Sequence, residues 1–391
     1  MIKPDSTLMR GVEAVFPSSE AFQQVLASGR KLAIYHGVDP TGPHLHLGHA
    51  TNLLLLRHFQ DLGHRVTFLI GDFTARIGDP SGKLSPRQPL SVTEVRQNFR
   101  TFRRQAAKII RFRGRNAASV VWNSKWLGQL HLADILELMS HVTVGQMIER
   151  DMFQTRLKAG KPIWLNEFLY PLLQGYDSVA LKVDVEIGGN DQTFNMLVGR
   201  DLLRVYRNQD KFVIATTLLM NPKTGKKLMN KSDGGLINLD DPPNVMYGKV
   251  MALPDEVIFS VAELCTMAPE TTINEWRTLH PRDVKMQVAR AVVTLYSNTK
   301  AAIRAEMEFV ATFQKHVAPT EMKEIKAVFG ERLSIVLIRA GSSTSQAEFR
   351  RLISAGAISE INGAIITDPY LILTHPVALK IGKHRFLRIV F

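Results

Sequence analysis

Two segments that lie far apart in this chain carry residues suited to chemistry on phosphates. Residues 39–49 read Asp-Pro-Thr-Gly-Pro-His-Leu-His-Leu-Gly-His, and residues 225–232 read Gly-Lys-Lys-Leu-Met-Asn-Lys-Ser. His46 and His49 stand at an expected helix start, three positions apart, so their side chains face the same way. Backbone N–H groups at a helix start attract anions, and Gly48 lets a flat ring approach the backbone. The pattern suits a nucleoside triphosphate attacked at its α-phosphate.

Each segment also has an ordinary explanation. Two histidines at helical spacing are often surface or metal-binding residues. However, no carboxylate or cysteine cluster completes a zinc site nearby, and the Glu of a His-Glu-x-x-His motif is missing, so we expect no protein metal site. A Lys-Lys pair beside glycine is usually a solvated turn. The order of the two segments, and the motifs between them, favour function.

Taken together, the two segments resemble the signature motifs of class I aminoacyl-tRNA synthetases, His-Ile-Gly-His and Lys-Met-Ser-Lys-Ser. Four further segments resemble the bacterial tyrosyl-tRNA synthetases and follow that family's order: residues 35–41, 78–83, 170–177 and 188–192. The resemblance implies activation of L-tyrosine by ATP to tyrosyl-adenylate and pyrophosphate. Transfer of the tyrosyl group to the 3′-terminal ribose of tRNA(Tyr) would follow.

The resemblance also implies roles for individual residues. The catalytic set would be His46, His49, Thr41, Lys231, Lys227, Lys83 and Arg87. ATP would be bound by Asp39, Gly48, Gly189, Asp191, Lys231 and Ser232, with Mg²⁺ held by no dedicated protein site. Tyrosine would be bound by Tyr35, Asp79, Tyr170, Gln174, Asp177 and Gln192, where Tyr35 and Asp177 contact the phenol. Asp79, Tyr170 and Gln174 would hold the α-ammonium group.

The second motif departs from the family pattern. Either Leu228 replaces its first lysine or one residue is inserted after Lys227, so Lys231 is the best-matching lysine. His36, in the segment that precedes the first motif, occupies a variable position.

Composition indicates the class of protein. The chain has 391 residues, enough for two or three domains, and a net charge of +13 with a pI near 9.8. This excess favours a polyanion such as tRNA, with an anionic membrane surface as the alternative. The single cysteine, Cys265, excludes an intrachain disulfide and suggests a reducing cytosol. Without an apolar run of membrane-spanning length, we expect a cytoplasmic protein that does not associate with membranes.

The motifs require a scaffold, and the first part of the chain alternates short apolar runs with amphipathic stretches. Expected strands are 31–34, 66–70, 119–122, 183–187 and 213–216, and expected helices are 50–62, 93–110 and 132–139. This alternation predicts an α/β fold with a doubly wound, Rossmann-like parallel sheet, whose ligands bind beyond the carboxyl ends of the strands. A Gly-x-Gly-x-x-Gly pattern does not follow the first strand, so a dinucleotide site is not expected.

Three domains are expected. Residues 1–235 form the catalytic domain, with a helical insertion near 130–172. By resemblance this insertion forms much of a homodimer interface, although an ordinary helical connection remains the alternative. Residues 236–325 form a helical anticodon-arm-binding domain that contains a helix at 282–300.

Residues 331–391 resemble the ribosomal-protein-S-four-like RNA-binding module. Helices are expected at 333–340 and from the cap-rich residues 342–345 to about residue 356, with a hairpin at Asn362-Gly363 and a basic terminal strand. The candidate tRNA-binding residues are Arg350, Arg351, Lys380, Lys383, Arg385 and Arg388. A plain surface-charge interpretation of these residues stays open.

Three rival functions are compatible with parts of this pattern. A tryptophanyl-tRNA synthetase shares the motifs, but Tyr35 and Asp177 suit a phenol better than an indole. Small-molecule adenylyltransferases share the first motif but are usually shorter and lack a basic C-terminal module. A catalytically silent RNA-binding descendant of a synthetase would not need both phosphate motifs.

Overall fold

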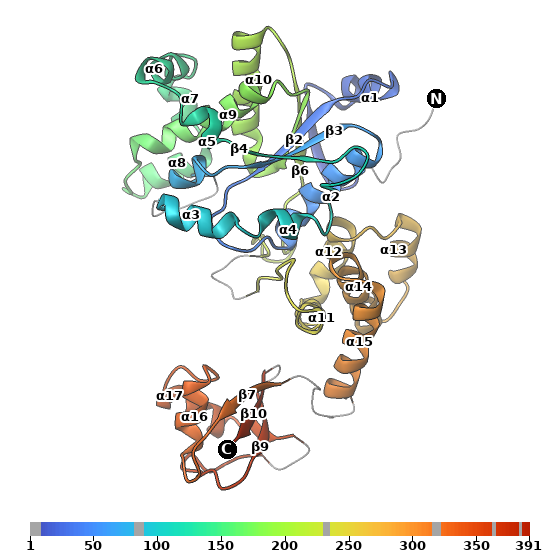
Figure 1. Ribbon diagram of the computed structural model, residues 1–391, viewed down its shortest axis with the longest axis vertical. Helices are drawn as coiled ribbons and strands as arrows, with labels where there is room; N and C mark the ends of the chain where they lie inside the picture. Colours follow the sequence, from blue (N-terminus) through green and yellow to red (C-terminus); the bar gives the residue numbers. More distant parts are fainter. Residues whose placement is uncertain (1–8, 82–89, 230–234, 315–321, 362–364, 383–384) are drawn as a thin grey trace. The chain divides into compact units, whose positions relative to one another are not determined.

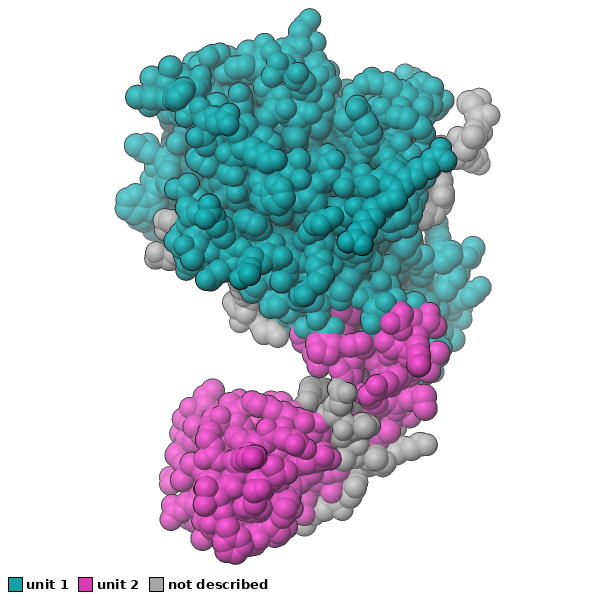
Figure 2. All heavy atoms as spheres, viewed as in Figure 1, with its two compact units in different colours: residues 1–241, 253–297 teal, residues 242–252, 298–391 magenta. Residues whose placement is uncertain are grey.

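The computed structural model describes residues 9–81, 90–229, 235–314, 322–361, 365–382 and 385–391. The chain divides into two compact units, shown in Figure 2. Unit 1 comprises residues 1–241 and 253–297, and unit 2 comprises residues 242–252 and 298–391. These units do not coincide with the three ranges expected from the sequence, and the division into three functional domains stays a prediction.

Within the described part of unit 1, a six-stranded sheet has the strand order β1-β6-β5-β2-β3-β4. The strands are β1 (Val12–Phe16), β2 (Ala33–Val38), β3 (Arg65–Ile70), β4 (Ser119–Trp122), β5 (Val185–Gly189) and β6 (Phe212–Thr216). All pairs except β1–β6 are parallel. The doubly wound α/β prediction is therefore confirmed, with β1 as an antiparallel addition at one edge. This strand escaped prediction because it buries one of its five residues and so has no clear apolar run.

Helices surround this sheet (Figure 1). They are α1 (Ser19–Ala27), α2 (Leu47–Asp61), α3 (Val92–Phe99), α4 (Phe102–Ala106), α5 (Ser124–Leu127), α6 (Leu132–Ser140), α7 (Val144–Ile148), α8 (Asp151–Lys158), α9 (Leu165–Leu181) and α10 (Thr193–Arg207). Helix α2 ends as expected, with Gly63 following in the left-handed region at φ +83°. Its inner face is buried over most of its length, which fixes the helix that begins with the first motif.

The expected helix 93–110 is wrong in one respect, because the structure breaks it into α3 and α4. Helix α4 is held against the first motif by the side chain of Gln105. Gln105 accepts a hydrogen bond from the N–H of Leu45 at 2.6 Å and donates to the carbonyl oxygen of Pro43 at 2.9 Å. Periodicity does not reveal such tertiary contacts, which override a continuous helical pattern.

Three more helices complete unit 1: α12 (Ile258–Cys265), α13 (Glu270–Trp276) and α14 (Pro281–Tyr296). Helix α14 buries Val284, Val288 and Val292 along one face, but it ends before the expected residue 300. Cys265 is buried at the end of α12, with its Sγ 3.5 Å from the carbonyl oxygen of Leu47.

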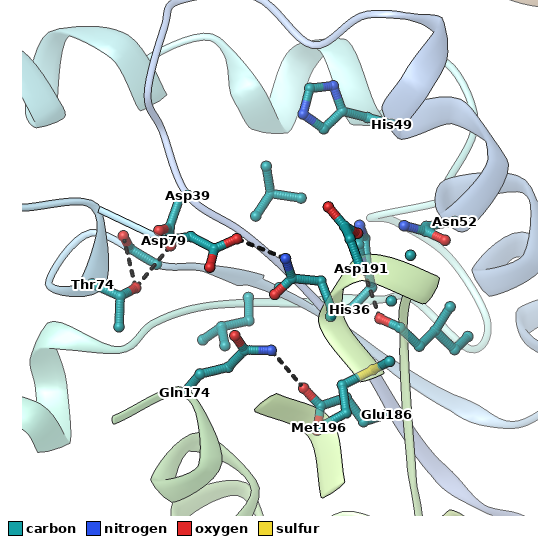
Figure 3. Close-up of a pocket in the computed structure, with 18 of the residues that line it drawn as sticks. His36, Asp39, His49, Asn52, Thr74, Asp79, Gln174, Glu186, Asp191 and Met196 are labelled. Carbon is teal, nitrogen blue, oxygen red and sulfur yellow. Dashed lines mark hydrogen bonds between the residues drawn. The ribbon is translucent and has the colours of Figure 1, made fainter. Parts of the chain in front are cut away.

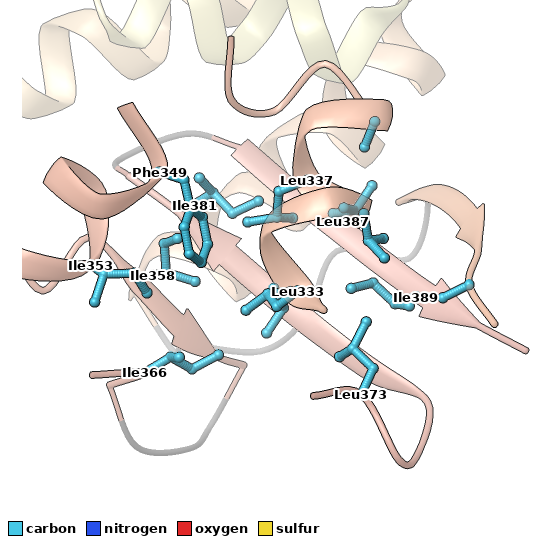
Figure 4. Packing of buried hydrophobic residues seen from close by; sticks show 14 residues of the cluster. Leu333, Leu337, Phe349, Ile353, Ile358, Ile366, Leu373, Ile381, Leu387 and Ile389 are labelled. Atoms are coloured by element: carbon cyan, nitrogen blue, oxygen red, sulfur yellow. The ribbon is translucent and has the colours of Figure 1, made fainter. Parts of the chain in front are cut away.

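Unit 2 contains α11 (Pro243–Met251), α15 (Thr299–Gln314), α16 (Leu333–Arg339) and α17 (Gln346–Ser354). Its described residues also form a sheet in the order β7-β10-β9-β8, made of β7 (Lys323–Lys326), β8 (Ile358–Glu360), β9 (Val377–Ile381) and β10 (Arg385–Val390). The expected single terminal strand is therefore two strands, β9 and β10. Figure 4 shows the core between α16, α17 and this sheet, built from residues such as Leu333, Phe349 and Leu387. Asn362-Gly363 lies outside the described residues.

Candidate functional site

A cavity of about 250 Å³ opens beside the carboxyl ends of β2 and β5 (Figure 3). Its lining includes every residue expected to bind tyrosine: Tyr35, Asp79, Tyr170, Gln174, Asp177 and Gln192. A second cavity, of about 790 Å³, shares Asp39, Thr41, Gly48, His49, Asp79 and Asp191 with the first and extends to Lys227 and Met229. The structure thus brings the expected tyrosine residues, the first motif and the described part of the second motif to one continuous site.

His46 and His49 begin helix α2 and hold each other in place. His46 is the N-cap, and its Nδ1 accepts from the N–H of Gly48 at 3.2 Å, while His49 Nδ1 accepts from the N–H of His46 at 3.1 Å. The two rings lie 4.0 Å apart between centroids. A Cβ at Gly48 would come within 3.0 Å of the His46 ring, which explains why glycine suits this position. The pair lies at a helix N-terminus, where anions are favoured.

Burial keeps His36 and His49 uncharged. It lowers the pKa of His49 well below the usual value, with smaller contributions from His46 and His36. Burial also lowers the pKa of His36 to about 4. His36 Nδ1 lies 2.8 Å from the carbonyl oxygen of Ile187, and its Nε2, buried and without a protein partner, lines the cavity. The sequence offered no role for His36.

One wall of the cavity is acidic. Asp39 accepts hydrogen bonds from the hydroxyls of Tyr170 and Thr74, each at 2.8 Å. Asp79 accepts from the Nε2 of Gln192 at 2.7 Å and from the N–H of Ser81 at 2.9 Å. A Cβ at Gly71 would lie 2.0 Å from Asp39, so only glycine fits behind this carboxylate. A wall of carboxylates with ordered polar neighbours suits a cationic group.

The far end of the cavity contains Asp177 and Tyr35. Asp177 accepts from Trp126 Nε1 at 2.8 Å and from Asn123 Nδ2 at 3.3 Å, and burial raises the pKa of this carboxyl well above the usual value. The Tyr35 hydroxyl lies 2.9 Å from Ser178 Oγ, and burial likewise raises the pKa of this phenol. The sequence did not predict Asn123 and Trp126 as site residues. They follow β4, and only the folding of the sheet brings them to Asp177 on α9.

Two further charged residues were also missed. Glu186 on β5 lines the cavity, and the Nζ of Lys211, the residue before β6, donates to it. The two side chains are 4% and 0% exposed. A partial signal existed, because Glu186, like Asp184, is a charged residue inside an expected strand. A charge at such a position needs a buried partner.

The second motif reaches the site through Lys227, whose Nζ donates to Asp191 Oδ2 at 2.8 Å. Lys227 was expected in the catalytic set and Asp191 among the ATP-binding residues, and the structure pairs them directly at the second cavity. Lys83, Arg87, Lys231 and Ser232 lie outside the described residues, so their roles stay predictions.

The expected tRNA-binding residues are divided between two faces of their module. Leu379, Ile381, Leu387 and Ile389 point into the core under α16 and α17, so the alternating Lys380 and Arg388 lie on the opposite face of the sheet. Arg388 pairs there with Glu324 at 3.2 Å.

Arg350 and Arg351 instead belong to α17, which covers the core face. Arg385 donates to the carbonyl oxygen of Ser342 at 2.7 Å. Lys383 lies outside the described residues. The module therefore presents two basic surfaces, one on α17 and one on the outer face of the sheet.

Among the described residues, no three His, Cys, Asp or Glu side chains gather as they would to hold a metal ion. Within the same ranges, no helix has the length and apolar character needed to cross a membrane.

Comparisons with known proteins identify the family. Residues 27–314 match the family described as class I tRNA synthetases (W and Y). The "Tyrosine--tRNA ligase" of Carboxydothermus hydrogenoformans is 41% identical, with 98% of this chain and 97% of that protein covered. The chain belongs to the tyrosine–tRNA ligase family. The protein of the same name from Thermotoga maritima is also 41% identical, over 98% of this chain and 96% of its own length.

A solved structure has the same fold. A C-terminally truncated mitochondrial tyrosyl-tRNA synthetase from Aspergillus nidulans aligns with a TM-score of 0.68 at 23% identity. The match covers 79% of this chain and 94% of that one.

Proposed function

We propose that this chain activates L-tyrosine with ATP and transfers the tyrosyl group to the 3′-terminal ribose of tRNA(Tyr). The observation that carries this proposal is the order of groups along one cavity. An acidic wall at Asp39 and Asp79, which line both cavities, lies between the end at Asp177 and the histidine pair at the start of α2. A tyrosine molecule with its phenol at Asp177 would place its ammonium and carboxylate groups towards ATP.

The acidic wall supports recognition of the α-ammonium group. The Tyr170 hydroxyl gives its proton to Asp39, so its oxygen can accept from a ligand. Asp79 supplies a charge opposite to that of the ammonium, and Gln174 lines the cavity beside them. Recognition of an ammonium by a carboxylate and oriented neutral acceptors uses charge-assisted hydrogen bonds, the stronger class.

The phenol end supports selection of tyrosine. Asp177 has two partners and can accept another hydrogen bond from a substrate phenol. A site with buried polar groups rejects phenylalanine, because that ligand leaves those groups unpaired. Tyrosyl-tRNA synthetases are themselves the standard example of this kind of discrimination, which needs no editing site.

On the ATP side, positioning and electrostatic stabilisation of the phosphoryl transition state can supply the rate enhancement without a covalent enzyme intermediate. His46, His49 and Thr41 border the phosphate end, and Asp191 is assigned to the ribose. Mg²⁺ enters with ATP, and the carboxylates around the cavity are ligands of the type it accepts. Lys231, Ser232, Lys83 and Arg87 complete the assignment from the sequence.

The helical insertion supports a homodimer. Its helices expose large apolar side chains that a monomer would leave in water: Leu132, Leu136, Met139, Val144, Leu157, Trp164 and Leu165. Leu165 is 83% exposed and Leu132 is 74% exposed. A second copy of this chain is the proposed partner, and the cytoplasm is the proposed location.

Tyrosine-dependent exchange of labelled pyrophosphate into ATP tests this function. The full chain should support exchange with tyrosine but not with tryptophan or phenylalanine at equal concentration. Charging of tRNA(Tyr) should follow when the tRNA is added. Exchange driven by tryptophan, or binding of tRNA without any exchange, would replace the proposal with one of the rival functions.

A further inference from the structure

A continuous line of polar side chains connects Lys211 with Asp79 along the cavity wall. Lys211 donates to Glu186, and Gln174 Nε2 donates to the other oxygen of Glu186 at 3.3 Å. Asn195 Nδ2 then donates to Gln174 Oε1 at 3.0 Å and to Gln192 Oε1 at 3.1 Å. Gln192 Nε2 closes the line on Asp79 at 2.7 Å. Figure 3 shows the contacts at both ends, from Gln174 to Glu186 and to Asp79.

The ends of this line determine how its amides point. A carboxylate can only accept, so Gln174 must turn its NH₂ group to Glu186 and Gln192 must turn its NH₂ group to Asp79. Both amide oxygens then face Asn195, which has to donate to both. Its own oxygen is consequently left over. Asn195 Oδ1 is indeed buried without a protein partner, on a side chain that is 0% exposed.

An unpartnered buried oxygen costs stability, so the arrangement calls for an explanation. With this polarity, Gln174 and Gln192 both present amide oxygens rather than NH₂ groups on the cavity side of Asn195, and both line the cavity. Each amide oxygen has a second lone pair available for a ligand. The wall therefore accepts hydrogen bonds and suits a ligand that only donates, such as an ammonium group.

Lys211 maintains this polarity from behind the wall. Its ammonium group also donates to Ser178 Oγ at 2.6 Å, and its side chain is 0% exposed. Without this cation, Glu186 would be a buried charge without a counter-charge, and the end of the line that fixes the direction of Gln174 would lose its ion pair. A Cβ at position 199 would lie 2.9 Å from Lys211 Nζ, so Gly199 provides room for the lysine.

We propose that Lys211, Glu186 and Asn195 are positioning residues that orient Gln174 and Gln192 as acceptors for the α-ammonium group of the amino-acid substrate. This inference rests on the proposed function, which places that group at Asp79. These three residues act through Gln174 and Gln192, and they determine which functional group the wall accepts.

The sharpest test is Glu186→Gln, which preserves shape. Lys211 would hold the new amide oxygen, so the NH₂ group would face Gln174 and force that amide to turn. Affinity should be measured by calorimetry for tyrosine, for tyramine, and for 3-(4-hydroxyphenyl)propanoate, which lacks the amino group. The affinities for tyrosine and tyramine should fall about tenfold or more, which is the effect of losing a hydrogen bond to a charged group. The affinity for the propanoate should change less than about twofold.

Two companion variants separate positioning from stability. Glu186→Gln with Lys211→Met removes the unpaired buried charge, so the melting temperature should recover while the selective loss of ammonium ligands persists in part. Glu167→Gln is the matched control, because it breaks the equally buried Arg156–Glu167 pair, whose residues line neither cavity. It should lower the melting temperature and leave the ligand ratio unchanged.

The results are decisive in either direction. If both Glu186 variants lose as much affinity for the propanoate as for tyrosine, the Lys211–Glu186 pair is only structural and the inference is overturned. A wild-type chain that binds tyrosine keeps the proposed function intact in that case. A wild-type chain that binds none of the three ligands overturns the proposed function and this inference with it.

Discussion

Tyr35 and Asp177 differ in how strongly the protein holds them, and substrate selection should reflect the difference. The Tyr35 hydroxyl has Ser178 as a partner, whereas Asp177 is a carboxylate fixed by two donors. Tyr35→Phe should reduce the preference for tyrosine over phenylalanine by about 1 kcal/mol, the net value of one neutral hydrogen bond. Asp177→Ala should damage tyrosine use far more. The ratio of kcat/KM for the two amino acids measures both effects, and an unchanged ratio in Tyr35→Phe would remove Tyr35 from phenol recognition.

Lys231 should act on the rate of activation more than on tyrosine binding. Its place in the second motif assigns it to charge that develops on the leaving phosphate. Lys231→Ala should therefore slow single-turnover adenylate formation by about two orders of magnitude, or roughly 3 kcal/mol. Lys223→Ala, which removes an exposed lysine that is paired with Glu256 just before the second motif, is the control. Equal rates for the two variants would exclude Lys231 from the mechanism.

The buried histidines should make folding sensitive to acid. The pKa of His36 is lowered to about 4 in the folded protein. As the pH falls below about 6.5, His36 is therefore protonated in the unfolded chain while it is still neutral in the folded one. His36 therefore costs no stability above pH 6.5, and stability is lost at about 1.4 kcal/mol per pH unit as the pH falls towards 4. Denaturant unfolding of His36→Gln should show a shallower dependence over this window. His375→Gln, at an exposed position, is the control, and an equal change in both variants would contradict the assignment.

At the scale of residues, the sequence predicts groups that belong to compact motifs and misses groups that meet through the sheet. Tyr170 and Gln174 share one helix, and their contact with the cavity follows from a recognisable segment. Lys211 and Glu186 are 25 residues apart and pair only because β5 and β6 are neighbours in register. Asn195 carries no charge, and only its geometry reveals its role.

At the scale of elements, the start of helix α2 combines a structural task and a proposed catalytic task in His46. The side chain caps the helix, and the same residue belongs to the first motif. His46→Ala should cost about 1 kcal/mol of stability through loss of the cap. His46→Asn supplies another capping side chain, so it should retain most of the stability while adenylate formation still falls. Thermal unfolding and pyrophosphate exchange measured on both variants separate the tasks, and full activity of His46→Asn would leave the imidazole with only a capping role.

The elements that the sequence predicts well are those whose pattern is local. Strand β4 and helix α6 have strong apolar runs and begin where expected. Strand β1 depends on its partner β6, and the break between α3 and α4 depends on contacts with residues 43–45. Long-range hydrogen bonds decided these cases, and no window of sequence contains them.

At the scale of the whole molecule, the C-terminal module has its own core, and β7 belongs to its sheet. A truncation that removes residues from 322 onward therefore deletes a complete sheet, whereas one at the expected boundary of 331 would leave β7 behind. The shortened chain should form tyrosyl-adenylate at a near-normal rate, because none of the assigned tyrosine or ATP residues is removed. Charging of tRNA should fall steeply and lose part of its salt dependence.

The two basic surfaces of that module provide a finer version of the same experiment. Arg350→Ala with Arg351→Ala tests α17, and Lys380→Ala with Arg388→Ala tests the outer face of the sheet. Substitution of the surface that contacts phosphates should reduce the slope of log affinity against log salt concentration by about one for each cation removed. A folded truncation that charges tRNA like the full chain would contradict both.

Cys265 gives the molecule a practical property. Burial raises the pKa of this thiol to about 12, and the thiolate is the form that reacts with electrophiles. It is the only cysteine in the chain. The native protein should therefore not react with maleimide dyes. Any cysteine introduced on its surface then becomes a unique attachment point. Lys223→Cys would place a fluorophore just before the second motif, where a change in its emission on addition of ATP can be measured without prior removal of native thiols.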